Sequence, residues 1–152
     1  MSGVRRFRDL DSHKLAVQLR RMVVRLSSRG PITQDREFVR QIRNSARGGP
    51  RNIGEGFARF VPSEHRHFLS YAKASLDETM NHIEDGRESN DFSAEEHQQL
   101  VTLTERTLAA VSRMMQYLES PEAKRAYERA REARRKKTHR RRTPPEPSNL
   151  EP

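Results

Sequence analysis

The sequence contains no cysteine and has no long apolar run. Without cysteine, the chain can form neither a disulfide framework nor a Cys-ligated zinc site. No apolar stretch approaches the ~20 residues that a membrane-spanning helix needs. The charged first ten residues are also not followed by the apolar segment of a signal peptide. We therefore expect a cytoplasmic protein that has no membrane partner, no metal and no cofactor.

Charged residues are abundant: they make up 34% of the 152 residues, against 32% hydrophobic residues, and the net charge is +9. This ratio suits a thin helical bundle or an oligomer better than a deep globular core. The charge is also unevenly placed, at +9 over residues 1–59, −5 over 60–118 and +5 over 119–152. Such complementary halves favour head-to-tail contacts between copies, which close into a ring when the rotation allows. A monomer with both halves solvated is the alternative.

Apolar residues recur at helical spacings of three and four in four segments, running from Leu15 to Leu26, Phe38 to Phe57, Phe68 to Ile83 and Leu100 to Leu118. No run alternates with the period of a strand. Short turns between helices favour antiparallel neighbours. The sequence therefore predicts an all-α fold over residues 1–120, an antiparallel up-down-up-down four-helix bundle.

Side chains that can cap helix N-termini precede each segment. The expected capping residues are Asp11-Ser12, Thr33, Ser63 and Ser93. The last of these begins a Ser-x-x-Glu pattern with Glu96, which is typical of a capping box.

The stretch Gly48-Gly49-Pro50 lies inside the second segment and would ordinarily mark a loop. However, the apolar phase continues across it to Ile53 and Phe57, and Pro50 itself falls on the apolar stripe. We therefore predict one long helix over about 34–59, kinked at Pro50 and held by tertiary packing, in which glycine lets a neighbouring helix approach closely. Two shorter helices are the alternative. The spacing of a phosphate-binding P-loop is absent.

After Pro121 the residues are helix formers with only an alanine stripe, so a marginal helix is expected. From Thr138 to Pro152 the composition is typical of disorder. Residues 121–152 are thus predicted to be a basic, partly helical to disordered tail.

Two sets of polar residues are considered as candidate sites. Glu64 and His67 form a Glu-x-x-His pattern without the second copy that a di-metal bundle needs, so we interpret them as surface residues. Asn52, Glu55 and Arg59 share one helical flank. They are expected to be partly buried and to fix helix packing, with a functional polar pocket as the alternative. No residue is predicted to be catalytic.

Arginines dominate the first two predicted helices, and arginine suits phosphate binding. The candidate nucleic-acid-binding residues are Arg20, Arg21, Arg25, Arg29, Arg36, Arg40, Arg43, Arg47, Arg51, and in the tail Arg134, Arg135, Lys136 and Lys137. Few aromatic residues are present for stacking on single strands, since they make up 6% of the chain. Backbone contact, tolerant of sequence and sensitive to salt, is therefore expected.

Several stretches resemble one known family. Its signature "QIRRAA-SIPANIAEG-GR" is similar to Gln41-Ile42-Arg43, Ser45-Ala46, Pro50, Asn52-Ile53, Glu55-Gly56 and Arg59. A third-helix pattern "FL-IA-GSL-E" is similar to Phe68-Leu69, Ala72, Ser75-Leu76 and Glu78, and Phe7-Arg8-Asp9-Leu10 resembles the family's opening. These are the four-helix-bundle proteins first noticed in intervening sequences of bacterial large-subunit ribosomal RNA genes. The accessory variability proteins of diversity-generating retroelements are related bundles. The chain departs from the pattern at Gly48-Gly49 and at Gly54.

The resemblance covers about residues 7–118 and implies a ring-like homo-oligomer, commonly a pentamer, with no established enzymatic activity. The related accessory proteins bind a reverse transcriptase and nucleic acid. Two functional hypotheses follow. One is a non-enzymatic oligomeric scaffold that binds RNA or DNA through arginine-rich surfaces, and the other is a protein-protein adaptor without nucleic-acid binding.

Overall fold

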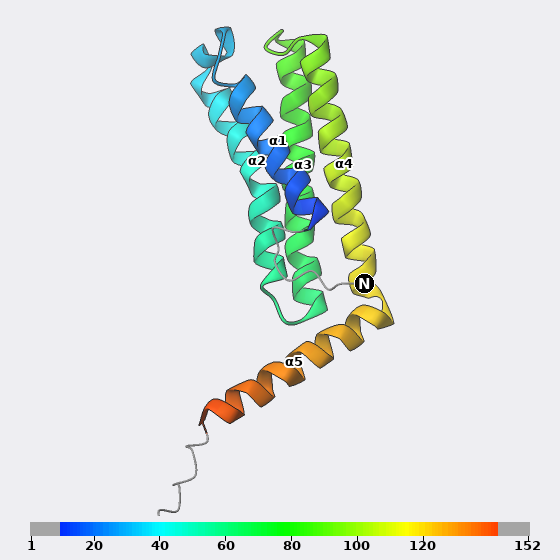
Figure 1. Cartoon of the computed structure of the whole chain (residues 1–152). Helices are drawn as coiled ribbons and strands as arrows, with labels where there is room; N and C mark the ends of the chain where they lie inside the picture. Colours follow the sequence, from blue (N-terminus) through cyan, green and yellow to red (C-terminus); the bar gives the residue numbers. More distant parts are fainter. Residues whose placement is uncertain (1–9, 143–152) are drawn as a thin grey trace, which may run out of the picture.

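The computed structural model describes residues 10–142, and these residues are all-α (Figure 1). The elements are α1 (Asp11–Leu26), the 3₁₀-helix η2 (Pro31–Gln34), α2 (Arg36–Phe57), α3 (Pro62–Glu88), α4 (Ala94–Glu119) and α5 (Pro121–Arg142). No strand occurs within this part of the chain. None of its helices combines the length and the apolar character needed to cross a membrane.

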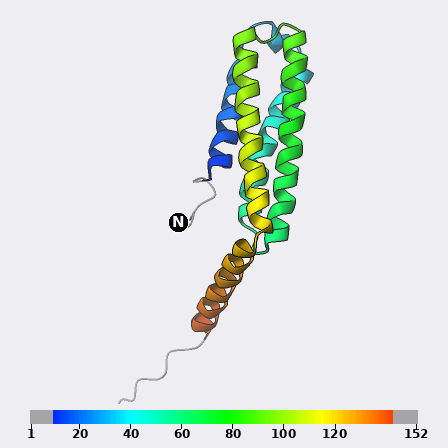
Figure 2. The ribbon, with the colours of Figure 1, turned by 90° about the vertical axis from the view of Figure 1, so that its right-hand side faces the viewer.

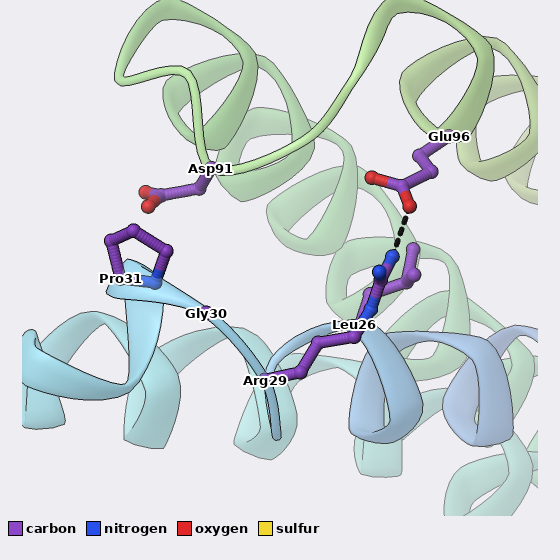
Figure 3. A pocket seen from close by; sticks show the side chains of 6 residues that line it. All are labelled: Leu26, Arg29, Gly30, Pro31, Asp91 and Glu96. Atoms are coloured by element: carbon purple, nitrogen blue, oxygen red, sulfur yellow. Dashed lines mark hydrogen bonds and ion pairs between the residues drawn. The ribbon is translucent and has the colours of Figure 1, made fainter.

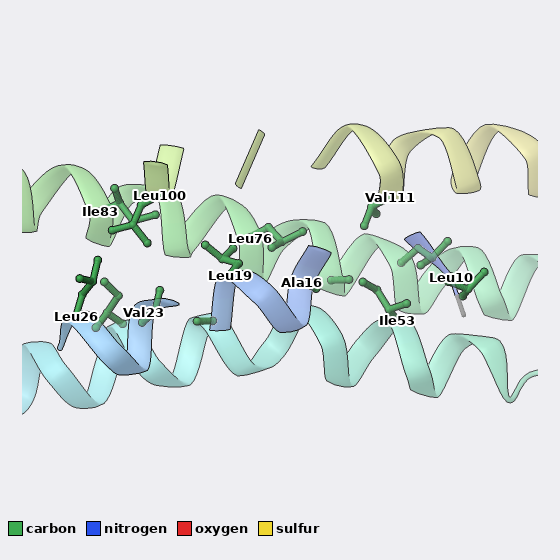
Figure 4. Packing of buried hydrophobic residues seen from close by; sticks show 14 of the residues in the cluster. Leu10, Ala16, Leu19, Val23, Leu26, Ile53, Leu76, Ile83, Leu100 and Val111 are labelled. Carbon is green, nitrogen blue, oxygen red and sulfur yellow. The ribbon is translucent and has the colours of Figure 1, made fainter. Parts of the chain in front are cut away.

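The helices α1 to α4 run in alternating directions and share one hydrophobic core. Helix α1 packs on α2 and α4, and α3 packs on the same two helices. Leu19, Ile53, Leu76 and Val111, one residue from each helix, are fully buried in this core (Figure 4). Among the helices, α5 contacts α4 and α3, and it extends past the end of the others (Figures 1 and 2).

Helix α2 runs without a break through Pro50, so the prediction of one long helix is confirmed and the alternative of two shorter helices is wrong. The predicted stripe is buried at Ile42, Ala46, Pro50 and Ile53. The kink at Pro50 stays a prediction. A proline and four glycines oppose helix formation locally, so burial of this stripe must hold the helix.

Helix α3 approaches α2 closely at Gly48 and Gly56. A Cβ added at Gly48 would lie 2.2 Å from Ser75 Oγ, and one at Gly56 would lie 3.1 Å from the carbonyl oxygen of His65. No larger residue fits either position without movement of α3. The predicted use of glycine for close helix approach is therefore confirmed.

One predicted cap is confirmed and three are wrong. Ser93 and Glu96 form the complete capping box at the start of α4. Asp11 and Ser12 lie inside α1, after Leu10 at its N-cap.

Asp35, rather than Thr33, caps α2, because the 3₁₀ turn delays the start of the helix, and its carboxylate accepts from the Phe38 N–H at 2.9 Å. Ser63 lies inside α3 because Pro62, whose fixed φ suits a first helical turn, starts that helix one residue earlier.

The prediction of disorder from Thr138 is wrong for residues 138–142, which continue α5. Arginine and lysine are good helix formers, and the Thr138 hydroxyl donates to the Arg134 carbonyl one turn earlier at 3.0 Å. Residues 143–152 and residues 7–9 of the resemblance lie outside the described part of the chain.

Candidate nucleic-acid interface

Helix α2 carries a stripe of arginines along the side opposite its buried face. The members are Arg36, Arg40, Arg43, Arg47 and Arg51, at successive spacings of 4, 3, 4 and 4. These spacings return to the same side of an α-helix at every turn. All are exposed except Arg43, which is half-buried. We call this set the α2 arginine stripe.

Arg43 has a structural role that the sequence did not indicate. Its Nε donates to Ser27 Oγ at 2.8 Å, and its Nη2 donates to the Ser27 carbonyl at 3.0 Å and to Ser28 Oγ at 2.8 Å. Ser27 is the C-cap of α1. A cation there satisfies an orphan carbonyl and complements the negative end of the helix dipole. Arg43 therefore ties α2 to the end of α1 and has fewer donors left for a ligand.

Arg40 is paired within its own turn of α2. Its guanidinium lies 2.5 Å from Glu37, and the Gln41 side chain donates to the same carboxylate at 2.7 Å. The hydrogen bond from Arg40 is the largest cause that lowers the pKa of Glu37. Both partners are well exposed, so this pair contributes little to stability and can open for another anion.

Among the described residues, Arg29 pairs with Glu96 at the start of α4 and not with a residue of α2. The two side chains form an ion pair at the edge of a hollow of ≈ 250 Å³ (Figure 3). The Ser93 backbone N–H is the largest cause that lowers the pKa of Glu96. Burial, and then Asp35, raises the pKa of Asp91 on the same hollow. Because carboxylates line it, this hollow does not suit a phosphate.

The remaining arginines of the first two helices make no ion pair with any residue between 10 and 142. They are Arg20, Arg21, Arg25, Arg36, Arg47 and Arg51, and of these only Arg20 is half-buried. Guanidinium groups without a carboxylate partner are suited to phosphate oxygens, which they can bind with two parallel hydrogen bonds.

The predicted tail residues Arg134, Arg135, Lys136 and Lys137 are exposed on α5. Within residues 10–142, helix α5 makes no contact with α2, so these cations are separate from the α2 arginine stripe. It places the Arg134 guanidinium 4.0 Å from the centroid of the Phe60 ring, in the connection between α2 and α3. The cations thus divide into two groups, one along α1 and α2 and one on α5.

The signature residues of α2 mostly serve packing. Ile53 is fully buried, Gly56 lies against α3, and Asn52 is half-buried. Glu55 pairs with Arg59 at 2.6 Å, but its side chain is 53% exposed, so the expectation that Glu55 is partly buried is wrong. The reason is its position two residues after the buried Ile53, which places it about 200° further around the helix, on the exposed side. The Arg59 guanidinium lies 4.5 Å from the centroid of the Phe68 ring on α3.

A buried pair, His65 and Tyr127, was not predicted from the sequence. His65 is only 2% exposed, and its Nδ1 lies 2.6 Å from the hydroxyl of Tyr127 on α5. Burial lowers the pKa of His65 to about 4 and raises the pKa of Tyr127 to about 12. Glu64 and His67, which flank His65 in the sequence, are exposed, as interpreted from the sequence. Nothing in the polar run Glu64-His65-Arg66-His67 distinguishes the one residue that is buried.

A comparison with protein families gives a match to the model described as 23S rRNA-intervening sequence protein, over residues 8–117. The match spans α1 to nearly all of α4 and excludes α5. A comparison with curated proteins found no match.

Proposed function

The chain belongs to the family of 23S rRNA-intervening sequence proteins, and from this premise we propose that it is a non-enzymatic helical scaffold that binds RNA or DNA through phosphate contacts. The observation that carries the proposal is the α2 arginine stripe, in which Arg36, Arg47 and Arg51 are exposed on one side of a packed helix. A rigid row of guanidinium groups contacts successive phosphates without reading bases. Binding is therefore tolerant of sequence and weakens steeply with salt.

The proposal includes assembly. Helices α1 to α4 act as an antiparallel up-down-up-down four-helix bundle that forms a cyclic homo-oligomer, with a pentamer favoured. Exposed carboxylates on α3 support head-to-tail contacts with basic surfaces of the next copy. They are Asp77, Glu78, Glu84, Asp85 and Glu88. We call them the α3 acidic stripe. Kinship with the accessory variability proteins of retroelements stays a prediction.

A double variant that removes two positive charges tests the proposal. R47Q/R51Q removes two exposed arginines of the α2 arginine stripe, and R106Q/R113Q removes two exposed arginines of α4, which lies in the acidic half of the chain. Binding of an arbitrary RNA or DNA duplex is measured by fluorescence anisotropy at several salt concentrations. We expect R47Q/R51Q to weaken binding to every sequence alike and to reduce the slope of log K against log salt by about 2 per bound copy. The control variant should retain both the affinity and the slope.

The oligomer mass of the same preparations is measured by light scattering, because a ring would present one α2 arginine stripe for each copy of the chain. The monomer mass is 17.7 kDa. A full-length protein that binds neither duplex nor single strand at low salt contradicts the nucleic-acid proposal. In that case the alternative, a protein-protein adaptor that presents the α3 acidic stripe, is favoured.

A further inference from the structure

The sequence has few aromatic residues, six phenylalanines and three tyrosines without tryptophan, and stacking on bases was not expected. The structure, however, gathers exposed rings around the connection between α2 and α3. Phe60 in that connection is 53% exposed, and Tyr71 on α3 is 48% exposed. Exposed apolar side chains that gather in one region often mark an interaction site.

Ring contacts join Tyr71 to two further rings of α3, and Phe60 adjoins this group in sequence through Arg59. The Tyr71 ring lies 4.6 Å from the His67 ring and 6.1 Å from the Phe68 ring, centroid to centroid. The Arg59 guanidinium, next in sequence to Phe60, lies over the Phe68 ring. We call Phe60, His67, Phe68 and Tyr71 the aromatic cluster.

Helix α5 brings cations to the aromatic cluster. Arg134 stacks on Phe60, and Arg135, Lys136 and Lys137 follow on the same exposed stretch. None of the four pairs with a carboxylate among residues 10–142. Among the carboxylates of this region, Glu55 pairs with Arg59 and Glu119 pairs with Arg66 at 2.8 Å, whereas Glu64, Glu128 and Glu132 make no ion pair within residues 10–142. Residues 128–137 of α5 nevertheless carry six cations against two carboxylates, so the excess charge of this stretch is positive.

We infer that the aromatic cluster and residues 134–137 form a binding site for unpaired nucleotides of a single strand. The inference rests on the proposed nucleic-acid binding and names a ligand class that the α2 arginine stripe does not select. Bases stack on Phe60 and Tyr71, because every base has a flat π face, and the cations of α5 hold the flanking phosphates. A duplex keeps its bases paired and offers only its backbone to this site.

A single strand is favoured as the occupant because it supplies binding partners for both parts of the surface, the rings and the cations. The rings require flat apolar faces, and the unpaired cations of residues 134–137 require anions at neighbouring positions. One nucleotide carries both within a few ångströms, whereas the α3 acidic stripe of a second copy offers carboxylates without aromatic rings.

The test uses the full chain and three fluorescent probes with equal numbers of phosphates per strand. These are a 12-nucleotide single strand, the same backbone without bases, and the corresponding duplex. We expect the single strand to bind about tenfold or more tightly than the base-free backbone for each stacked base. The variant F60A/Y71A should lose this excess and keep its affinity for the other two probes. Y117A, which removes another exposed tyrosine, should behave as the unaltered chain.

A direct readout comes from F60W, which carries the only tryptophan of the chain. Its fluorescence should be quenched by the single strand and not by the base-free backbone. Equal affinity of the unaltered chain and F60A/Y71A for the single strand overturns this inference, while continued duplex binding leaves the proposed function standing. A lower oligomer mass of F60A/Y71A, with circular dichroism unchanged, also overturns it, because the rings would then join copies of the chain.

Discussion

Helices α2 and α5 have the same length, 22 residues each, and both are rich in arginine, yet they are helical for opposite reasons. Helix α2 contains four glycines and a proline and is buried on one side from Ile42 to Gly56. Helix α5 has no glycine after Pro121 and consists mostly of strong helix formers, but only Ala123 of its described side chains is fully buried. Tertiary packing stabilises helix α2, and local helix propensity stabilises helix α5.

The difference decides how each helix can present its cations. The α2 arginine stripe is fixed on a helix whose opposite face is embedded in the core, so the Cα atoms of its arginines keep a constant spacing. The cations of α5 lie on a helix attached mainly at its start, through Ala123 and the contact of Tyr127 with His65. The first arrangement suits a regular backbone, and the second suits a single strand of variable path.

The largest effect is expected where α2 depends on close packing. G48V should lower the free energy of unfolding by about 3 kcal/mol, because its Cβ would collide with Ser75 and overpacking of a helix interface costs on this scale. N44V places the same side chain on the exposed side of α2 and should change stability by less than about 0.5 kcal/mol. Urea unfolding followed by circular dichroism measures both.

The double variant G48V/S75G sharpens this result. Removing the Ser75 side chain opens the space that valine needs, so the double variant should be less destabilised than the sum of the two single variants. Strict additivity would show that the helices do not meet at Gly48, and the packing explanation of α2 would then be wrong.

The second effect concerns the contact between α5 and the first turn of α3, where His65 meets Tyr127. Burial lowers the pKa of His65 from 6.5 to about 4. Between these values the unfolded chain binds more protons than the folded chain, so the free energy of unfolding falls as the pH drops. From pH 7 to pH 5 this loss should be about 2 kcal/mol.

In H65Q this part of the loss should vanish, because glutamine does not titrate. The difference between the two stability curves isolates His65 from the other histidines. Parallel curves for the two proteins between pH 7 and pH 5 would contradict the burial of a neutral His65.

The smallest effect on stability is expected from loss of the hydrogen bond between α5 and α3. Y127F removes the hydroxyl that bonds His65 Nδ1 and should cost about 1 kcal/mol, the usual net value of one buried hydrogen bond. Y117F, at the exposed end of α4, should cost nothing measurable. A loss from Y127F as large as that from G48V would mean that α5 depends on packing as much as α2 does.

The parts of the fold that follow from periodicity were predictable from the sequence. The apolar stripe from Ile42 to Ile53 continued through Pro50, and the helix did the same. The capping box at Ser93 was readable because both of its residues are local in sequence. The starts of α2 and α3 were placed wrongly, because a 3₁₀ turn before α2 and a proline at the first position of α3 shift a helix boundary without changing its period.

The candidate site was only partly predictable. The positions of the arginines were evident, but Arg43 and Arg29 proved to be engaged with Ser27 and Glu96, which lie far away in sequence. The meeting of Phe60 and Arg134, 74 positions apart, has no signature in either segment. Such contacts depend on where α5 leaves α4, which composition does not encode.

The sequence by itself determined the helices of this protein and the face that each of them buries, because hydrophobic period and capping act between residues a few positions apart. Only the tertiary structure decided which arginines remain unpaired, why His65 is neutral and where the exposed rings meet the cations of α5. Those properties depend on distances between separate helices, and these distances are set by side-chain packing, as at Gly48 and Gly56.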